Sequence, residues 1–144
     1  MKKKLYVGCA LNNVPKDKQD FLLMIPEIKE KLKNDFEILE FRSSVHDFIN
    51  NTHTFSPKEI YEFDIKDSVM NADVMLAICD YPSLGLGYEM ATAIEKRGIP
   101  VLALAHENSS VSKLILGINH PNFHFIRYKT TEEIVQKAQE ILTK

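Results

Sequence analysis

Residues 74–97, VMLAICDYPSLGLGYEMATAIEKR, contain the pattern that decides the fold. The apolar run Val74 to Cys79 is typical of a strand buried on both faces, and Met90 to Arg97 has the apolar spacing of a helix. Between them lies a predicted loop, Tyr81 to Glu89, with two glycines. Strand, glycine-containing loop and helix build ligand sites in open α/β sheets, because glycines let backbone N–H groups approach a ligand and a helix start favours an anion. We therefore predict a crevice here, with Glu89 in the first turn of the helix.

The rest of the chain alternates between strand and helix patterns. Strands are predicted over residues 5–10, 36–41, 74–79, 101–105 and 123–128. Helices are predicted over residues 16–34, 56–72, 90–97 and 110–118, and from residue 130 onward. This alternation predicts a single domain over residues 1–144 with an α/β fold. The expected architecture is a flavodoxin-like or Rossmann-like three-layer sandwich, with a five-stranded parallel sheet and a site at the carboxyl ends of the strands.

Three local signals add detail to this outline. Pro26 lies inside the first helix pattern and predicts a kink or a break near Ile25. Residues Ser56 to Glu59 have the spacing of a capping box and predict a helix start, and Asp64 predicts a weaker restart of the same helix. The segment Arg42 to Phe55 is rich in Ser, Asn and Thr and predicts a long irregular loop, which in a small domain is usually functional or mobile.

Composition argues against several classes of protein. A chain of 144 residues with 44% hydrophobic content is long enough for one domain with a core. Its formal net charge of -2 argues against a main role in holding a nucleic-acid polymer or an anionic membrane. The apolar stretch 5–11 is far below the roughly 18 residues that a membrane span needs. Cys9 and Cys79 lie in predicted strands and form no CxxC pair, which favours reduced core cysteines. We expect a cytoplasmic protein without a metal or another cofactor.

Several stretches together resemble a known enzyme family. They are Tyr6 and Gly8 on the first predicted strand, residues 71–73 with the strand that follows, and above all residues 82–89, PSLGLGYE. In this order they are similar to the nucleoside 2-deoxyribosyltransferase superfamily, and within it to the 2'-deoxynucleoside 5'-phosphate N-hydrolase branch. The similarity in element order covers nearly the whole chain, and its most specific part is PSLGLGYE.

The resemblance implies cleavage of the bond between a nucleobase and C1' of deoxyribose. That reaction passes through an oxocarbenium-like state, so it needs a carboxylate below the sugar and a way to protonate the departing base. In the family, the glutamate matched by Glu89 is the nucleophile that forms a covalent deoxyribosyl intermediate, which water or a second base then resolves. The tyrosine matched by Tyr6 holds that glutamate in position.

The family also has an aspartate at the start of the preceding helix, which assists protonation of the leaving group. Asp64 is the preferred match, because it can lie at a helix start that faces the cleft, although it lies one residue further from residues 72–73 than the family spacing. Asp67 lies too close to them and is the alternative. A third interpretation is that Asp64 only caps a helix and Asp67 completes its capping box.

Ser83 distinguishes between branches of the family. Transferases that use unphosphorylated nucleosides tend to carry an acid here, whereas the phosphate-dependent branch carries serine, which can donate to a 5'-phosphate. Together with the backbone N–H groups near Gly85 and Gly87, Ser83 favours a nucleoside monophosphate. Ser112 matches a serine that the family contributes from a neighbouring subunit, which implies a homodimer. A serine near a helix start is otherwise usually a cap.

The loop after the first strand departs from the family pattern. The phosphate-dependent branch has a Ser-Ile-Arg-Gly-Gly-like loop, and this chain has Ala10-Leu11-Asn12-Asn13. The amides of Asn12 and Asn13 can bond to phosphate oxygens but supply no charge. The requirement for the 5'-phosphate therefore stays open at this point.

The sequence thus predicts an N-glycosidase that acts on 2'-deoxyribonucleoside 5'-monophosphates. One alternative is a deoxyribosyltransferase, which forms the same intermediate and passes it to another base. Another is a non-catalytic nucleotide-binding domain on the same fold, because a fold alone does not fix activity. The expected partners are a small nucleoside or nucleotide and further copies of the chain, in a homodimer or a larger homo-oligomer. Neither a nucleic-acid polymer nor a membrane is expected.

Overall fold

A five-stranded parallel sheet forms the centre of the computed structural model, which describes residues 1–42, 45 and 54–144. The strands are β1 (Lys3–Cys9), β2 (Phe36–Leu39), β3 (Val74–Ile78), β4 (Val101–His106) and β5 (Phe123–Tyr128). The described helices are α1 (Asp20–Leu32), α3 (Pro57–Tyr61), α4 (Leu84–Ala91), α5 (Lys113–Leu116) and α6 (Thr131–Leu142). The predicted parallel α/β sheet is confirmed.

Short helical turns lengthen three of these helices. A 3-10 turn, Lys16–Lys18, precedes α1. A π-helical segment, Glu62–Ser68, and a 3-10 turn, Val69–Asn71, continue α3 toward β3. A second π-helical segment, Thr92–Arg97, continues α4 and ends at Gly98, whose positive φ of 63° closes the helix in the left-handed region.

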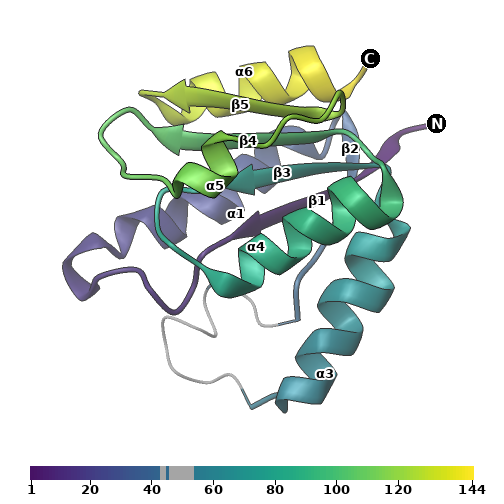
Figure 1. Cartoon of the computed structure of the whole chain (residues 1–144), viewed down its shortest axis with the longest axis horizontal. Helices are drawn as coiled ribbons and strands as arrows, with labels where there is room; N and C mark the ends of the chain where they lie inside the picture. The colour runs from purple at the N-terminus through teal and green to yellow at the C-terminus, as the bar shows by residue number, and fades with distance from the viewer. Residues whose placement is uncertain (43–44, 46–53) are drawn as a thin grey trace.

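The strand order β2-β1-β3-β4-β5 is the flavodoxin-like order. Helices α1 and α6 pack together on one face of the sheet, and α3, α4 and α5 lie on the other (Figure 1). Strands β1 and β3 are neighbours, but the connections that follow them leave to opposite faces. A crevice forms at the carboxyl ends of two such strands, and this is where ligands bind in open α/β sheets.

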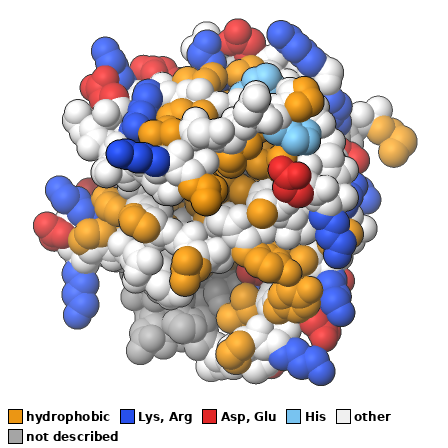
Figure 2. Space-filling view, in the orientation of Figure 1, with side chains coloured by type: hydrophobic (Ala, Val, Ile, Leu, Met, Phe, Trp, Pro, Cys, Tyr) orange, Lys and Arg blue, Asp and Glu red, His pale blue; other side chains and the backbone are white. Residues whose placement is uncertain are grey.

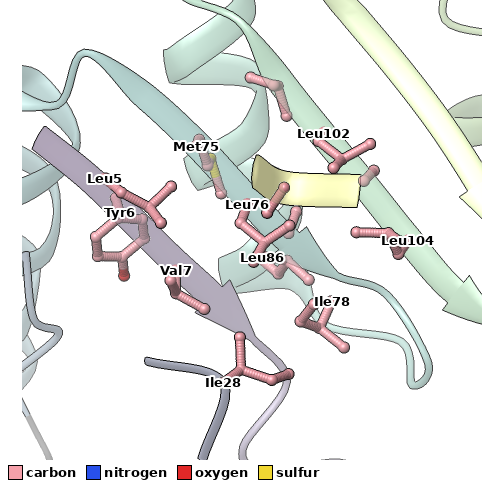
Figure 3. Close-up of a cluster of buried hydrophobic side chains, with 14 of the residues drawn as sticks. Leu5, Tyr6, Val7, Ile28, Met75, Leu76, Ile78, Leu86, Leu102 and Leu104 are labelled. Atoms are coloured by element: carbon pink, nitrogen blue, oxygen red, sulfur yellow. The ribbon is translucent and has the colours of Figure 1, made fainter. Parts of the chain in front are cut away.

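The core lies between the central strands and the helices on both faces. All five residues of β3 are buried, as are the first five residues of β4. Figure 3 shows buried side chains of β1, β3 and β4, with Ile28 of α1 and Leu86 of α4, which cover opposite faces of the sheet. Continuous apolar strands of this kind are expected where helices cover both faces of a parallel sheet.

Helix α4 begins earlier than the sequence predicts. The stretch Tyr81 to Glu89 was predicted as a loop, but the helix begins at Leu84. The reason is a cap, because the Ser83 side chain accepts a hydrogen bond from the N–H of Leu86 at 3.1 Å. Glu89 therefore lies in the second turn of the helix rather than the first, and its side chain projects back toward the crevice.

The predicted capping box at the start of α3 is confirmed. The side chain of Ser56 accepts from the N–H of Glu59, and the Glu59 carboxylate accepts from the N–H of Ser56, both at 3.2 Å. The predicted restart at Asp64 is wrong, because the helical backbone continues through it as a π-helical segment. Of the kink or break predicted near Ile25, the break does not occur, since α1 runs through Pro26 from Asp20 to Leu32, and the kink stays a prediction.

The predicted irregular loop lies mostly outside the part of the chain that the structure describes. Of the predicted loop 42–55, residues 43–44 and 46–53 lie outside the described residues. Cys9 and Cys79 are free thiols in the structure, Cys79 buried and Cys9 partly buried. No described helix has the length and apolar character needed to cross a membrane.

Arg97 ends the helical segment that continues α4, and it bonds to the end of the helical segment that continues α3. Its guanidinium donates to the carbonyls of Val69, Met70 and Ala72 at 3.0, 2.5 and 2.9 Å. We expect Arg97→Met to lower the free energy of unfolding by about 2 kcal/mol, because partly buried carbonyls lose charge-assisted hydrogen bonds. Urea unfolding measures this loss. The exposed neighbour Lys96, changed to methionine, is the control, and an equal loss in both variants would contradict the expectation.

Candidate active site

A cleft of about 390 Å³ opens at the carboxyl end of β1. It lies between the start of α4 and α3 with the π-helical segment that continues it. Seven of the residues that the sequence singled out line it: Tyr6, Asn12, Asn13, Asp64, Ser83, Gly85 and Glu89. They come from three parts of the chain, so the fold brings together residues that are up to 83 positions apart. The cleft lies where the strand order predicts a binding crevice.

Glu89 lies at the bottom of this cleft, where its side chain is 9% exposed. One carboxylate oxygen, Oε2, accepts a hydrogen bond from the hydroxyl of Tyr6. Tyr6 is 1% exposed, and burial together with the charge of Glu89 raises its pKa well above the usual value, so that the phenol keeps its proton and acts as the donor. The predicted contact between these two residues is present in the structure.

The electrostatic environment of Glu89 favours its neutral form. Burial raises the pKa of the Glu89 carboxyl to about 8, and the nearby charge of Asp64 adds to the rise. The hydrogen bond from Tyr6 acts in the opposite direction, because it stabilises the carboxylate. A buried carboxyl with a pKa near neutrality is typical of groups that react or transfer protons.

Among the residues that the structure describes, Asp64 is the aspartate that lines the cleft. It is partly buried, and burial raises its pKa, while the N–H of Arg42 donates to its Oδ1 at 2.7 Å and acts in the opposite direction. Asp67 is exposed and does not line the cleft. Asp64 therefore lies in the cleft and Asp67 does not, but Asp64 does not lie at a helix start as the sequence predicts. The π-helical segment places it there, and the sequence carries no clear signal for such a segment.

Ser83 and the start of α4 form one wall of the cleft. The N–H groups of Leu84 and Gly85 precede the first intrahelical hydrogen bond of α4, and neither is bonded to a described residue. A Cβ atom at Gly85 would meet only Ser83 Oγ, at 3.8 Å, and one at Gly87 would meet nothing within 4 Å. Packing against the described part of the chain therefore does not require these glycines, which is consistent with close approach of a ligand.

Asn13 has a structural contact. Its Nδ2 donates to the carbonyl of Pro82 at 2.9 Å and ties the loop after β1 to the loop before α4. Asn12 is exposed at the mouth of the cleft. The described residues that line the cleft include no lysine or arginine, and residues 43–44 and 46–53 contain none in sequence.

Gly87 and Ser112 line a second, larger cleft of about 1600 Å³ rather than the Glu89 cleft. Ser112 caps α5, since its Oγ accepts from the N–H of Leu114 at 3.2 Å. Ser83 and Leu84 border both clefts. Figure 2 shows hydrophobic side chains exposed on the face that carries α4 and α5, and Leu84 is 96% exposed.

Sequence reasoning missed a polar cluster in the larger cleft. Asp80 accepts hydrogen bonds from the Tyr128 hydroxyl at 2.5 Å and from the N–H of His106 at 3.2 Å. These residues lie at the carboxyl ends of β3, β4 and β5, and they hold these ends together. Strand-end positions of consecutive strands were the available signal. In the part of the chain that the structure describes, no group of three or more His, Cys, Asp and Glu side chains is placed to hold a metal.

The apolar lining of the Glu89 cleft was also missed. Leu11, Phe41 and Ile60 come from three different segments and complete its walls. Cys9 lines it as well, and burial raises the pKa of its thiol to about 12, so the thiol is protonated at neutral pH. Each of these residues reads as an ordinary core or loop residue in the sequence, and only the tertiary arrangement places it at the site.

No family model matches the chain. A curated protein from Thermofilum pendens, named "Putative 2'-deoxynucleoside 5'-phosphate N-hydrolase 1", is 40% identical over 89 residues, which are 60% of this chain and 61% of the relative. A protein of the same name from Methanococcoides burtonii is 32% identical over 81 residues, 56% of this chain and 65% of the relative. The chain is a homologue of these proteins. The resemblance to this branch is thereby confirmed, and the matches span less than two thirds of each relative.

Solved structures share the fold. The structure of the Clostridium botulinum CMP N-glycosidase BcmB superposes with a TM-score of 0.70, at 20% sequence identity, and the match covers 96% of this chain and 99% of that one. A conserved protein from Enterococcus faecalis V583 superposes with a TM-score of 0.51 at 19% identity, covering 95% of this chain and 88% of the other. At these identities the likeness confirms the α/β architecture.

Proposed function

We propose that this protein is an N-glycosidase that hydrolyses the bond between the base and the deoxyribose of 2'-deoxyribonucleoside 5'-monophosphates. The observation that carries the proposal is Glu89, a buried carboxyl that accepts a hydrogen bond from the Tyr6 hydroxyl and lines a cleft of about 390 Å³. The name of the homologous proteins supports the same substrate class. Asp64 supplies a second carboxyl group in the same cleft.

In the proposed reaction, the Glu89 carboxylate attacks C1' of the sugar and forms an ester. The bond from C1' to the base nitrogen breaks, and its electron pair leaves with the base, which takes a proton from Asp64. Water then attacks C1', gives its proton to Asp64 and releases Glu89. Two displacements at C1' retain the configuration of the sugar. Burial, which raises the pKa of Asp64, favours the protonated form that the first step needs.

The pKa of Glu89 has a consequence for this mechanism. With a pKa of about 8, only roughly a tenth of the free protein carries the Glu89 carboxylate at pH 7. The positive charge that develops on the sugar stabilises the carboxylate in the transition state, where it is needed. A carboxylate kept out of water in this way is also a stronger nucleophile.

The 5'-phosphate would be held by neutral donors. The Ser83 hydroxyl and the N–H groups at the start of α4 face the cleft, and Asn12 lies at its mouth. A helix N-terminus favours an anion without any cationic side chain. We propose this group of donors as the phosphate subsite.

A panel of substrates tests the proposal. The protein is incubated with the four deoxynucleosides and with their 5'-monophosphates, each with and without a free acceptor base, and released or exchanged bases are separated by chromatography. Base release that is selective for monophosphates and independent of acceptor supports the hydrolase. Exchange that requires the acceptor identifies a deoxyribosyltransferase. Binding by calorimetry without turnover identifies a non-catalytic domain.

We also propose that two copies of the chain assemble, so that Ser112 of one copy reaches the phosphate in the other. Within its own chain Ser112 does not line the Glu89 cleft, which is consistent with a role across an interface. Sedimentation at micromolar concentration checks this proposal. A fully active monomer, or a Ser112→Ala variant with an unchanged KM for the monophosphate, contradicts it.

Tyr6→Phe is expected to reduce kcat/KM at pH 7 by about tenfold. The Tyr6 hydrogen bond lowers the pKa of Glu89, so its loss raises that pKa further above 8 and leaves less carboxylate at pH 7. The pH profile of kcat/KM should therefore shift to higher pH. Tyr88→Phe is the control, because Tyr88 precedes Glu89 on α4 but is 55% exposed and lies outside both clefts. A profile that stays in place would contradict the role of Tyr6.

A further inference from the structure

Gly8 lies on β1, two residues after Tyr6, so both residues face the same side of the sheet. On that side the Tyr6 hydroxyl donates to Glu89 Oε2. Gly8 pairs with Ala77 of β3, next to the crevice between these strands. Among the described glycines only Gly98 has a positive φ, so the backbone conformation does not require glycine at position 8.

The space above Gly8 is occupied by atoms of three side chains. A Cβ atom at this position would lie 2.9 Å from Leu86 Cδ1, 3.1 Å from Glu89 Oε1 and 3.2 Å from Met75 Cε. Favourable contacts between carbon atoms are about 3.5–4.0 Å long, so the contacts with Leu86 and Met75 would be compressed. The contact with Glu89 Oε1 would also be tighter than is usual for a Cβ atom. The missing side chain thus leaves the room in which Oε1 of Glu89 lies.

We infer that Gly8 is a positioning residue for Glu89. It lets the carboxylate lie close to β1, with Oε2 on the Tyr6 hydroxyl and the other oxygen, Oε1, directly over the strand. This inference rests on the proposed function, in which Glu89 attacks C1'. It adds a second constraint on the nucleophile: Tyr6 binds one oxygen, and the absence of a side chain at position 8 sets how deep the other can lie.

Gly8→Ala tests the inference. The contacts to Leu86 and Met75 are made by the ends of flexible side chains, so the variant can fold with small shifts of both. Oε1 must move by a few tenths of an ångström while Tyr6 still binds Oε2. Small misplacements of a reacting atom are costly, since about 1 Å can cost 10²-fold in rate. We expect kcat to fall by about tenfold and KM to change by less than about twofold.

A second readout does not depend on activity. In protein labelled with ¹³C at the glutamate carboxyl carbons, the Glu89 resonance reports its own titration, and Glu89→Gln assigns it. In Gly8→Ala the added methyl group buries the carboxylate further, so the midpoint should rise above that of the unmodified protein. A role for Gly8 in packing alone would leave this titration unchanged, and that result would overturn the inference.

Two double variants test whether the defect of Gly8→Ala comes from its contact with the Glu89 carboxylate or from its contact with Leu86. In a Glu89→Asp background the shorter side chain withdraws from position 8, so adding Gly8→Ala should cost no further activity. In Gly8→Ala/Leu86→Val the leucine contact is relieved while the carboxylate contact remains, so activity should not recover. Recovery in the second variant would assign the defect to Leu86 and would overturn the inference.

Folding is covered by the same set of variants. If Gly8→Ala unfolds and Gly8→Ala/Glu89→Asp folds, the carboxylate is the group that needs the space, as inferred. If both unfold, the constraint comes from the packing of α4 on β1, and the inference is wrong. Failure of the proposed function looks different. The unmodified protein would then release no base, or Glu89→Gln would keep its base release, while the carboxyl titration would still show whether Gly8 places Glu89.

Discussion

Glu89→Gln is expected to lower the rate of base release by about 10³-fold or more, because an amide cannot form the ester with C1'. The substitution keeps the size of the side chain, and the amide oxygen can still accept the hydrogen bond from Tyr6. Substrate binding should therefore persist. Single-turnover measurements with saturating protein isolate the chemical step from binding.

The matched control is Glu95→Gln. Glu95 is exposed and lies on the helical segment that continues α4, outside both clefts. It should release base at the rate of the unmodified protein. Near-normal release by Glu89→Gln would exclude this residue as the nucleophile. Trapping of a covalent adduct by acid quench and mass spectrometry, in the unmodified protein alone, would support the ester.

The second large effect concerns stability and has the opposite sign. The folded state raises the pKa of Glu89 from 4.5 to about 8, whereas an unfolded chain returns it to its ordinary value. Between these two pH values the unfolded chain has released the proton and the folded protein still binds it. Proton release therefore favours unfolding, and the free energy of unfolding falls as the pH rises from about 4.5 to about 8.

Glu89→Gln removes this titration. We expect the variant to be more stable than the unmodified protein at pH 9, by an amount on the order of a few kcal/mol, and this advantage to shrink toward pH 4.5. Urea unfolding at pH 4.5, 7 and 9 measures both curves, with Glu95→Gln again as control. Asp64 titrates in both proteins, so its contribution cancels to first order in the comparison. A difference that does not vary with pH would show that folding does not shift the pKa of Glu89.

Much of the fold was readable from local patterns. The apolar runs at residues 74–79 and 101–105 predicted buried parallel strands because both faces of the sheet are covered. The start of α4 was misplaced by six residues, since glycines were given more weight than the serine cap at Ser83. Asp64 was assigned to the cleft for the wrong local reason, because a π-helical segment leaves no clear mark in the sequence.

The candidate site, like the fold, was only partly predictable from the sequence. The pair of Tyr6 and Glu89 came from the resemblance to a family, because a contact across 83 positions has no local signature. Substrate binding by Asn13 stays a prediction, and the structure adds a contact of its amide group with the neighbouring loop, which the sequence did not indicate. The role of Gly8 depends on a distance of a few ångströms between a strand and a helix, which only the packed structure contains.

The contact between Asn13 and Pro82 matters for protein engineering. It joins the two loops that flank the entrance of the Glu89 cleft, so the Asn13 side chain holds these loops together. An Asn13→Arg substitution, made to add a cation for phosphate, would remove this hydrogen bond. Position 12 is exposed at the same entrance and is the better place for such a substitution. Adjacent asparagines, alike in sequence, thus offer unequal starting points for redesign.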